Sequence, residues 1–246
     1  MNGLSAPAGY ESVTVGRAEA VAIAALVPML RQLLSGGTLY AYAAGRIDAK
    51  ALSGRQTAYA IPAPGVGGGI VVRHNRHGGL LAGITGDRFR YPTRAPYEFD
   101  VGRRLAAAGV PTPEMVAYVV YRAGAGLARA DVATRLVEPG RDLAGALAAG
   151  DAARRTADLD LVASLVAALS RAGARHHDLN SKNVLIADRA MVLDVDRVQF
   201  GWKPQDALAH NLARLDRSLR KRRERLGERI SDEEIAQMAR SAAERM

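Results

Sequence analysis

Two short apolar runs with a polar turn between them constrain the fold of this chain most. The runs are residues 184–186 and 191–193, and the turn lies at residues 188–189. This pattern predicts a small β-hairpin. Asn183 enters the first strand and Asp194 follows the second. Because a hairpin brings its own two ends together, we expect Asn183 and Asp194 to face one space.

The polar side chains of this region suit phosphoryl transfer. The amide oxygen of Asn183 and the carboxylate of Asp194 are hard oxygen ligands of the kind that bind Mg²⁺ carrying nucleotide phosphates. Asp178 precedes them on the loop, where its carboxylate could accept a proton from an attacking hydroxyl. The alternative is that these side chains only cap turns, as Asp and Asn often do. Their occurrence together, in register with the apolar strands, favours a phosphotransferase.

The same region resembles the catalytic and metal-binding loops of the protein-kinase-like fold, whose pattern is H-x-D-L-x-x-x-N followed by D-F-G. The chain reads H-H-D-L-N-S-K-N over residues 176–183 and D-V-D over residues 194–196. Asn180 stands where protein kinases usually have lysine, and Asp196 replaces the glycine. Both departures are similar to the bacterial lipopolysaccharide kinase family, and most of all to its 3-deoxy-D-manno-octulosonic acid (Kdo) kinases.

A second stretch resembles the same family. Residues 70–81 read I-V-V-R-H-N-R-H-G-G-L-L, which is similar to the V-L-R-H-x-R-R-G-G-L segment of Kdo kinases. A kinase-like fold places a cation that holds the α- and β-phosphates at the end of such a strand, and here the cation is Arg73 instead of lysine. Arginine can hold phosphate through two hydrogen bonds. Glu98, on an expected helix at residues 95–108, matches the glutamate that pairs with this cation.

The resemblance implies an α+β, protein-kinase-like fold with two lobes. The β-rich N-lobe would cover residues 1–138 and the small helical C-lobe residues 139–246. ATP and Mg²⁺ would be the cofactors, and the acceptor would be a sugar hydroxyl of Kdo on Kdo-lipid A. Motifs and resemblance together assign Asp178 and His176 to catalysis, Gly54, Arg55, Arg73, Glu98 and Glu138 to ATP, Asn183 and Asp194 to the metal, and Arg76, Arg88, Arg94 and Lys182 to the acceptor.

The remaining sequence predicts the other elements. We expect an irregular or weakly stranded lead-in over residues 1–16, a helix at 18–34, and strands at 39–44, 49–52, 58–61, 70–73, 116–121 and 127–136. Further helices are expected at 142–149, 156–172 and within 206–246. The loop that contains Gly54 lies between two expected strands, where its backbone N–H groups could contact nucleotide phosphates.

Composition and charge limit the class of protein. The chain of 246 residues has no cysteine, which indicates a reducing compartment without a disulfide framework. We find no signal-peptide layout, and the apolar run at residues 20–30 is too short to span a membrane, so we expect a cytoplasmic protein, peripheral on the inner face of the membrane. The net charge of +9 favours anionic partners. The basic run at 217–225 could contact lipid head groups or nucleic acid, or could simply face solvent. We expect no nucleic-acid partner. The sequence does not determine the oligomeric state.

Other functions remain open at this point. A small-molecule phosphotransferase of the aminoglycoside type or an atypical protein kinase would keep the fold and change the acceptor. These more often have H-G-D or a lysine on the third strand, neither of which occurs here. A nucleotide-binding pseudokinase would suit Arg73, but it need not retain Asp178, Asn183 and Asp194 together. Residues 197–246 are few for an activation segment and peptide platform, which favours a sugar or lipid acceptor.

Overall fold

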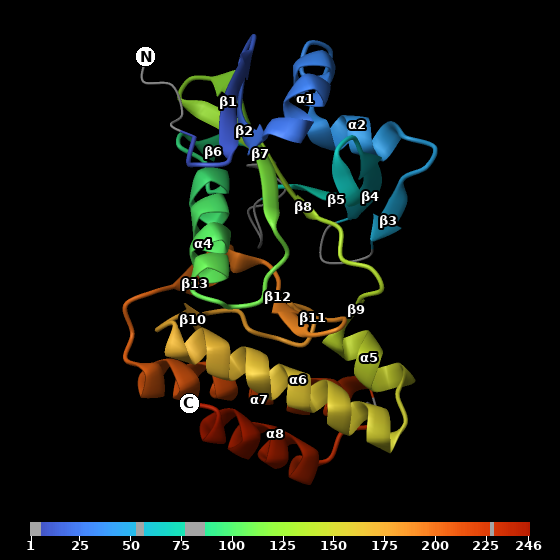
Figure 1. The fold of residues 1–246 in the computed structure, drawn as a ribbon, viewed down its shortest axis with the longest axis vertical. Coiled ribbons are helices and arrows are strands. Elements are labelled where there is room, and N and C mark those ends of the chain that lie inside the picture. Colours follow the sequence, from blue (N-terminus) through green and yellow to red (C-terminus); the bar gives the residue numbers. More distant parts are fainter. Residues whose placement is uncertain (1–5, 53–56, 77–86, 227–228) are drawn as a thin grey trace. The chain divides into compact units, whose positions relative to one another are not determined.

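The computed structural model describes residues 6–52, 57–76, 87–226 and 229–246 (Figure 1). The chain divides into two units: the first contains Met1–Asp100 and Glu114–Leu136, and the second contains Val101–Pro113 and Val137–Met246. The sequence assigned residues 101–113 to the N-lobe. They group with the second unit because Val101, Leu105 and Val110 pack in its core.

An antiparallel sheet forms the first unit. Its neighbours follow the order β1-β2-β7-β8-β5-β4-β3, and β6 pairs with β8. The strands are β1 (Tyr10–Val15), β2 (Ala18–Ile23), β3 (Lys50–Leu52), β4 (Ala58–Ala63), β5 (Val66–His74), β6 (Phe89–Arg90), β7 (Met115–Gly124) and β8 (Leu127–Arg135). At the end of β5, Arg73 lies opposite Val132 and His74 opposite Asp131 on β8. The strand that carries the predicted phosphate cation is therefore paired on both sides.

The helix predicted at residues 18–34 is wrong in its first half. The stretch forms β2, a 3-10 turn at Ala24–Leu26 and the short helix α1 (Val27–Leu33). β2 pairs with both β1 and β7, and its alanines and valine are buried on both faces of the sheet. A strand buried on both faces has a continuous apolar sequence, which periodicity cannot separate from a helix. Pro28 suits the first turn of α1, where no backbone N–H is needed.

Two other expectations concern the start of the chain, and one of them needs correction. Residues 1–16 were expected to be irregular or weakly stranded, and within them β1 is a regular strand. Residues 39–44, predicted as a strand, form the helix α2 (Leu39–Gly45). Thr38 caps this helix, because its side chain accepts a hydrogen bond of 3.0 Å from the backbone N–H of Ala41. Such a cap satisfies one of the unpaired donors at a helix start.

Helices form most of the second unit. They are α5 (Leu143–Ala149), α6 (Ala152–Arg171), α7 (Pro204–Leu226) and α8 (Asp232–Glu244), together with the C-terminal half of α4 (Ala95–Ala107). Helices α6, α7 and α8 lie side by side (Figure 1). Ser231 and Glu234 form a reciprocal capping box at the start of α8.

The predicted hairpin is confirmed in the second unit. β11 (Val184–Ile186) pairs with β12 (Ala190–Val192), with Val184 opposite Val192. β9 (Arg141–Asp142) pairs with β11, and β10 (Arg175–His176) pairs with β13 (Val198–Gln199). The α+β prediction of a β-rich N-terminal part and a helical C-terminal part is thus confirmed. In the described part of the chain, no helix has the length and apolar character needed to cross a membrane.

Candidate active site

One buried histidine holds the loop between β10 and β11 in place. His176 is 0% exposed, and its Nδ1 accepts a hydrogen bond of 3.1 Å from the backbone N–H of Asp178. Its Nε2 therefore carries the proton and donates to the carbonyl oxygen of Leu193, at 3.1 Å. Burial lowers the pKa of His176, and the bond to Leu193 and the charge of Asp194 offset only part of this effect. The neutral ring thus links the backbone of Asp178 to the residue before Asp194.

A buried asparagine from α7 supports this histidine from the other side. Asn211 is 0% exposed, and its Oδ1 accepts a hydrogen bond of 3.0 Å from the backbone N–H of His176. Its Nδ2 donates to the carbonyl oxygen of Ala174, at 2.9 Å. A single side chain therefore satisfies a donor and an acceptor of the chain that enters the loop.

The two asparagines of the loop have different hydrogen-bonding roles. Asn180 uses both ends of its amide within the loop: Nδ2 donates to the carbonyl oxygen of Asp178, and Oδ1 accepts from the backbone N–H of Lys182, both at 2.9 Å. Asn183 donates from Nδ2 to the same carbonyl oxygen of Asp178, at 2.9 Å. Since Nδ2 faces the loop, Oδ1 of Asn183 is directed away from that carbonyl, as a metal ligand would require.

Asp194 follows a residue whose backbone is fixed on both sides. The N–H of Leu193 donates to the carbonyl oxygen of Asn183, at 2.8 Å, and its own carbonyl accepts the bond from His176. Asp194 then adopts a left-handed conformation with φ 55 and ψ 52, which aspartate tolerates better than most residues. The Asn183 amide and the Asp194 carboxylate thus come from adjoining positions of the hairpin. This donor set fits a Mg²⁺ ion that also binds phosphate oxygens.

A guanidinium that the sequence did not single out contacts the predicted base. Nη2 of Arg214, on α7, donates to Oδ1 of Asp178 at 3.2 Å. On the same helix, Oγ of Ser218 accepts a hydrogen bond of 3.2 Å from the backbone N–H of Ser181. With Asn211, these residues follow the spacing i, i+3, i+7 of one helix face. In the sequence, this spacing of polar residues in an otherwise basic helix was the signal that could have identified them.

The first unit contains the predicted cation and its partner. Nη2 of Arg73 donates to Oε1 of Glu98, which lies in the first turn of α4. The Glu98 side chain is 3% exposed, whereas that of Arg73 is 33% exposed. A buried carboxylate is costly without a charged partner, so the pair fixes the guanidinium near the end of β5. The predicted pairing is observed, and its role in ATP binding stays a prediction.

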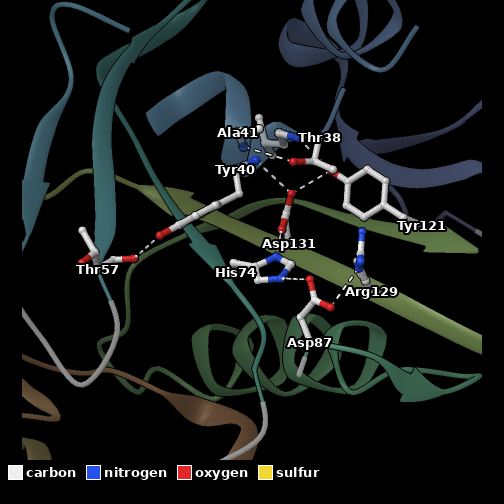
Figure 2. Close-up of polar contacts among 10 residues, drawn as sticks. Thr38, Tyr40, Ala41, Thr57, His74, Asp87, Tyr121, Arg129 and Asp131 are labelled. Carbon is white, nitrogen blue, oxygen red and sulfur yellow. Dashed lines mark hydrogen bonds and ion pairs between the residues drawn. The ribbon is translucent and has the colours of Figure 1, made fainter. Parts of the chain in front are cut away.

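The residue after Arg73 lies between two carboxylates (Figure 2). Nδ1 of His74 is 2.6 Å from Oδ1 of Asp131, and Nε2 is 3.0 Å from Oδ2 of Asp87. Ionised carboxylates only accept hydrogen bonds, so both ring nitrogens donate and His74 is an imidazolium. Burial alone would lower the pKa of His74, but the hydrogen bonds and charges of Asp131 and Asp87 outweigh burial and raise it.

Other side chains complete this network, which sequence reasoning missed. Oδ2 of the fully buried Asp131 accepts from the hydroxyl of Tyr121 at 2.7 Å and from the backbone N–H of Tyr40 at 2.9 Å. Burial and the charge of Asp131 raise the pKa of Tyr121, which keeps its hydroxyl protonated. Arg129 donates to Oδ1 of Asp87 at 2.9 Å (Figure 2). The signal was an aspartate between the apolar residues Ala130 and Val132 of β8, because a buried charge requires partners.

The other predicted site residues occupy exposed positions or lie outside the described part of the chain. Gly54 and Arg55 lie outside the described residues. Exposed residues among the remaining assignments are Arg76, Arg88, Arg94, Glu138 and Lys182. Their assignments to ATP and to the acceptor stay predictions.

Comparison with known proteins gives a consistent result. The model of the "Lipopolysaccharide kinase (Kdo/WaaP) family" matches residues 50–243. A 3-deoxy-D-manno-octulosonic acid kinase of Xylella fastidiosa (strain 9a5c) is 31% identical over 209 residues, which cover 82% of this chain and 80% of that protein. The enzyme of the same name from Stenotrophomonas maltophilia (strain K279a) is 35% identical over 177 residues, covering 69% and 68%.

A further relative of that name, from Actinobacillus succinogenes, is 34% identical over 174 residues, covering 65% of this chain and 70% of the relative. A solved structure of WaaP in complex with acyl carrier protein has a TM-score of 0.47 and 19% identity, covering 88% of this chain and 96% of that one. The family match spans most of the chain and includes the whole loop and hairpin described above. The prediction of an ATP-dependent phosphotransferase is therefore confirmed, and the chain belongs to the lipopolysaccharide kinase (Kdo/WaaP) family.

Proposed function

We propose that this protein transfers the γ-phosphoryl group of ATP to a sugar hydroxyl of Kdo on Kdo-lipid A, with Asp178 as the base. The observation that carries the proposal is the bonding of the loop. His176 and Asn183 both bond to the backbone of Asp178, and both also bond to Leu193, next to Asp194. The names of the relatives support Kdo as the acceptor.

The reaction requires one proton transfer and one displacement. As the acceptor oxygen attacks the γ-phosphorus, its proton passes to the Asp178 carboxylate. The bond between the γ-phosphorus and the bridging oxygen breaks, and its electron pair remains on ADP. Mg²⁺, when bound by Oδ1 of Asn183 and the carboxylate of Asp194, would neutralise charge on the phosphates. The protein contributes mainly position and preorganised charge.

We assign His176 to positioning within this site. Both of its ring nitrogens are bonded to the backbone and its side chain is buried, so proton exchange with an acceptor would first require these bonds to break. In the first unit, we assign Arg73 to the ATP phosphates. Glu98 would hold the Arg73 guanidinium in one orientation, so that less rotamer entropy is lost on binding.

We also propose that the enzyme acts at the inner face of the cytoplasmic membrane, where its acceptor would be presented. The net charge of +9 supports attraction to anionic lipid head groups. The exposed Arg76, Arg88, Arg94 and Lys182 are the residues that we assign to the anionic groups of the acceptor.

The test is a transfer assay with purified full-length protein, labelled ATP, Mg²⁺ and Kdo-lipid A. Asp178→Asn should lower kcat by at least about 10²-fold, the usual contribution of a general base. Asp188→Asn, in the exposed turn of the same hairpin, is the matched control and should retain wild-type turnover. Normal turnover by Asp178→Asn would refute the assigned role of Asp178.

The same assay separates the alternative functions. Kanamycin and casein serve as acceptors for the aminoglycoside-type and protein-kinase alternatives, and transfer to either of them but not to Kdo would refute the proposed acceptor. ATP binding without transfer to any acceptor would indicate a pseudokinase. Presenting Kdo-lipid A in phosphatidylglycerol and in phosphatidylcholine vesicles tests the membrane proposal, which predicts a higher rate with the anionic lipid. Equal rates would contradict it.

A further inference from the structure

We propose that Arg214 is a positioning residue for the phosphoryl-transfer step, which orients Asp178 and supplies positive charge beside it. The inference rests on the proposed function of Asp178 as the base. It concerns a residue of α7 that lies far from the loop in sequence, outside every motif of the catalytic region.

The contact engages only part of the guanidinium. Nη2 of Arg214 donates to Oδ1 of Asp178 at 3.2 Å. Along the same edge of the guanidinium lies Nε, which is buried and has no hydrogen-bond partner among the described residues. This edge matches the two oxygens of an oxyanion. A buried donor without a partner is unusual in a native protein and often marks a functional position.

The contact with Arg214 orients the Asp178 carboxylate and leaves one of its oxygens able to accept a proton. The bond from Arg214 uses Oδ1 of Asp178 and so fixes the plane of the carboxylate. Its other oxygen, Oδ2, can then face an acceptor hydroxyl. The oxygen that loses its proton attacks the γ-phosphorus, so Asp178 and the phosphoryl group come close during the reaction. Both are anions, and a guanidinium beside them reduces their repulsion.

The catalytic loop does not place a positive charge of its own at residue 180, two residues after Asp178. Asn180 is neutral, and both ends of its amide are bonded within the loop. The one histidine of α7, His210, does not provide a positive charge either. Burial lowers the pKa of His210, and the positive charges of Arg175 and Arg214 lower it further, so His210 is neutral near pH 7. Arg214 is therefore the charged group that α7 brings to Asp178.

Hydrogen bonds on either side of Arg214 fix its position along α7 relative to the loop. Asn211 bonds to the backbone of His176 and Ala174 one turn before it, and Ser218 bonds to the backbone of Ser181 one turn after it. The guanidinium thus lies between two anchored turns of the helix. Preorganisation of this kind is what makes a charge effective in a transition state.

The experiment compares Arg214→Gln, Arg214→Lys and Arg214→Ala with Arg217→Gln, measured with ATP and detergent-solubilised Kdo-lipid A. Arg217 is exposed on the same helix and serves as the matched control for loss of one positive charge. Arg214→Gln should lower kcat by about 10²- to 10³-fold, with KM for ATP within about threefold of wild type because the effect is confined to the transition state. Arg214→Lys should recover part of kcat, and added methylguanidine should raise the turnover of Arg214→Ala.

Several results would overturn the inference. One is a kcat of Arg214→Gln within about fivefold of Arg217→Gln. Another is a loss of kcat that neither the Arg214→Lys substitution nor added methylguanidine relieves, which would indicate a structural role. The fluorescence of the single tryptophan, Trp202, checks the folding of each variant. Asp178→Asn is measured in parallel. If Asp178→Asn is fully active, the proposed function fails; if it is inactive while Arg214→Gln is active, only the role of Arg214 fails.

Discussion

Replacing Asn211 with alanine should destabilise the second unit and disorder the entry to the catalytic loop. The substitution removes two buried hydrogen bonds at once. The N–H of His176 loses its acceptor, and the carbonyl oxygen of Ala174 loses its donor. Because Asn211 is fully buried, the two backbone groups cannot turn to water without local unfolding.

The size of the effect follows from these two groups. Each buried polar group left without a partner costs about 1–3 kcal/mol, so the pair costs about 2–6 kcal/mol. Alanine favours helix formation over asparagine by up to about 0.7 kcal/mol, which offsets a small part. We therefore expect the free energy of unfolding to fall by about 1–5 kcal/mol, a large share of the stability of a typical domain at the upper end of this range.

Urea unfolding followed by tryptophan fluorescence measures this change in the relevant unit. The only tryptophan of the chain, Trp202, lies in the second unit, where its ring stacks under Arg175 at 3.8 Å. Gln205→Ala, at an exposed position in the first turn of the same helix, is the control and should change stability by less than about 0.5 kcal/mol. A loss below about 1 kcal/mol in Asn211→Ala would refute the reasoning, because two orphaned groups cannot cost so little.

Two further predictions concern the first unit. The pKa of His74 is raised, so the stabilisation from its hydrogen bonds is complete below the ordinary histidine pKa of 6.5 and is lost as the pH rises through the raised value. His74→Gln should therefore flatten the fall of Tm on the alkaline side. An unchanged slope of Tm against pH would exclude His74 as the origin of that fall. Glu98→Gln weakens the ion pair that orients Arg73, so KM for ATP should rise by about tenfold, the equivalent of one charge-assisted hydrogen bond. Steady-state kinetics measures this rise, and a KM equal to that of wild type would show that Arg73 needs no such partner.

The elements that were predicted well are those whose signals are local. The hairpin at Val184–Ile186 and Ala190–Val192 combines short apolar runs with a polar turn, and pairing follows from chain proximity. The pairing of Arg73 with Glu98 is not local, and its prediction came from the resemblance to a known family. The failure at residues 18–34 has a physical cause, since a strand buried on both faces and a buried helix have the same continuous apolar sequence.

The side chains that were missed act through tertiary contacts. Asn211 and Arg214 reach the loop only because α7 packs beside β10. Their residue types have many ordinary uses on a charged helix, so the sequence offers spacing as the only signal. Asp131 was the easier case, because a carboxylate between apolar neighbours in a strand must have a partner when it is buried.

The interactions of α7 and α8 bear on where the positive charge of the chain lies. Arg220 pairs with Asp216 and Asp232, and Arg214 pairs with Asp178. Arg220, in the basic run at 217–225, and Arg214, before it, thus pair with carboxylates of the protein itself. The net charge of +9 already subtracts these carboxylates, so pairing leaves it unchanged, but these positions offer less positive charge to an anionic surface than a basic run read alone suggests. Attraction to a membrane would then depend on exposed cations elsewhere on the chain, which is why the comparison of anionic and neutral vesicles must be made with the wild-type protein.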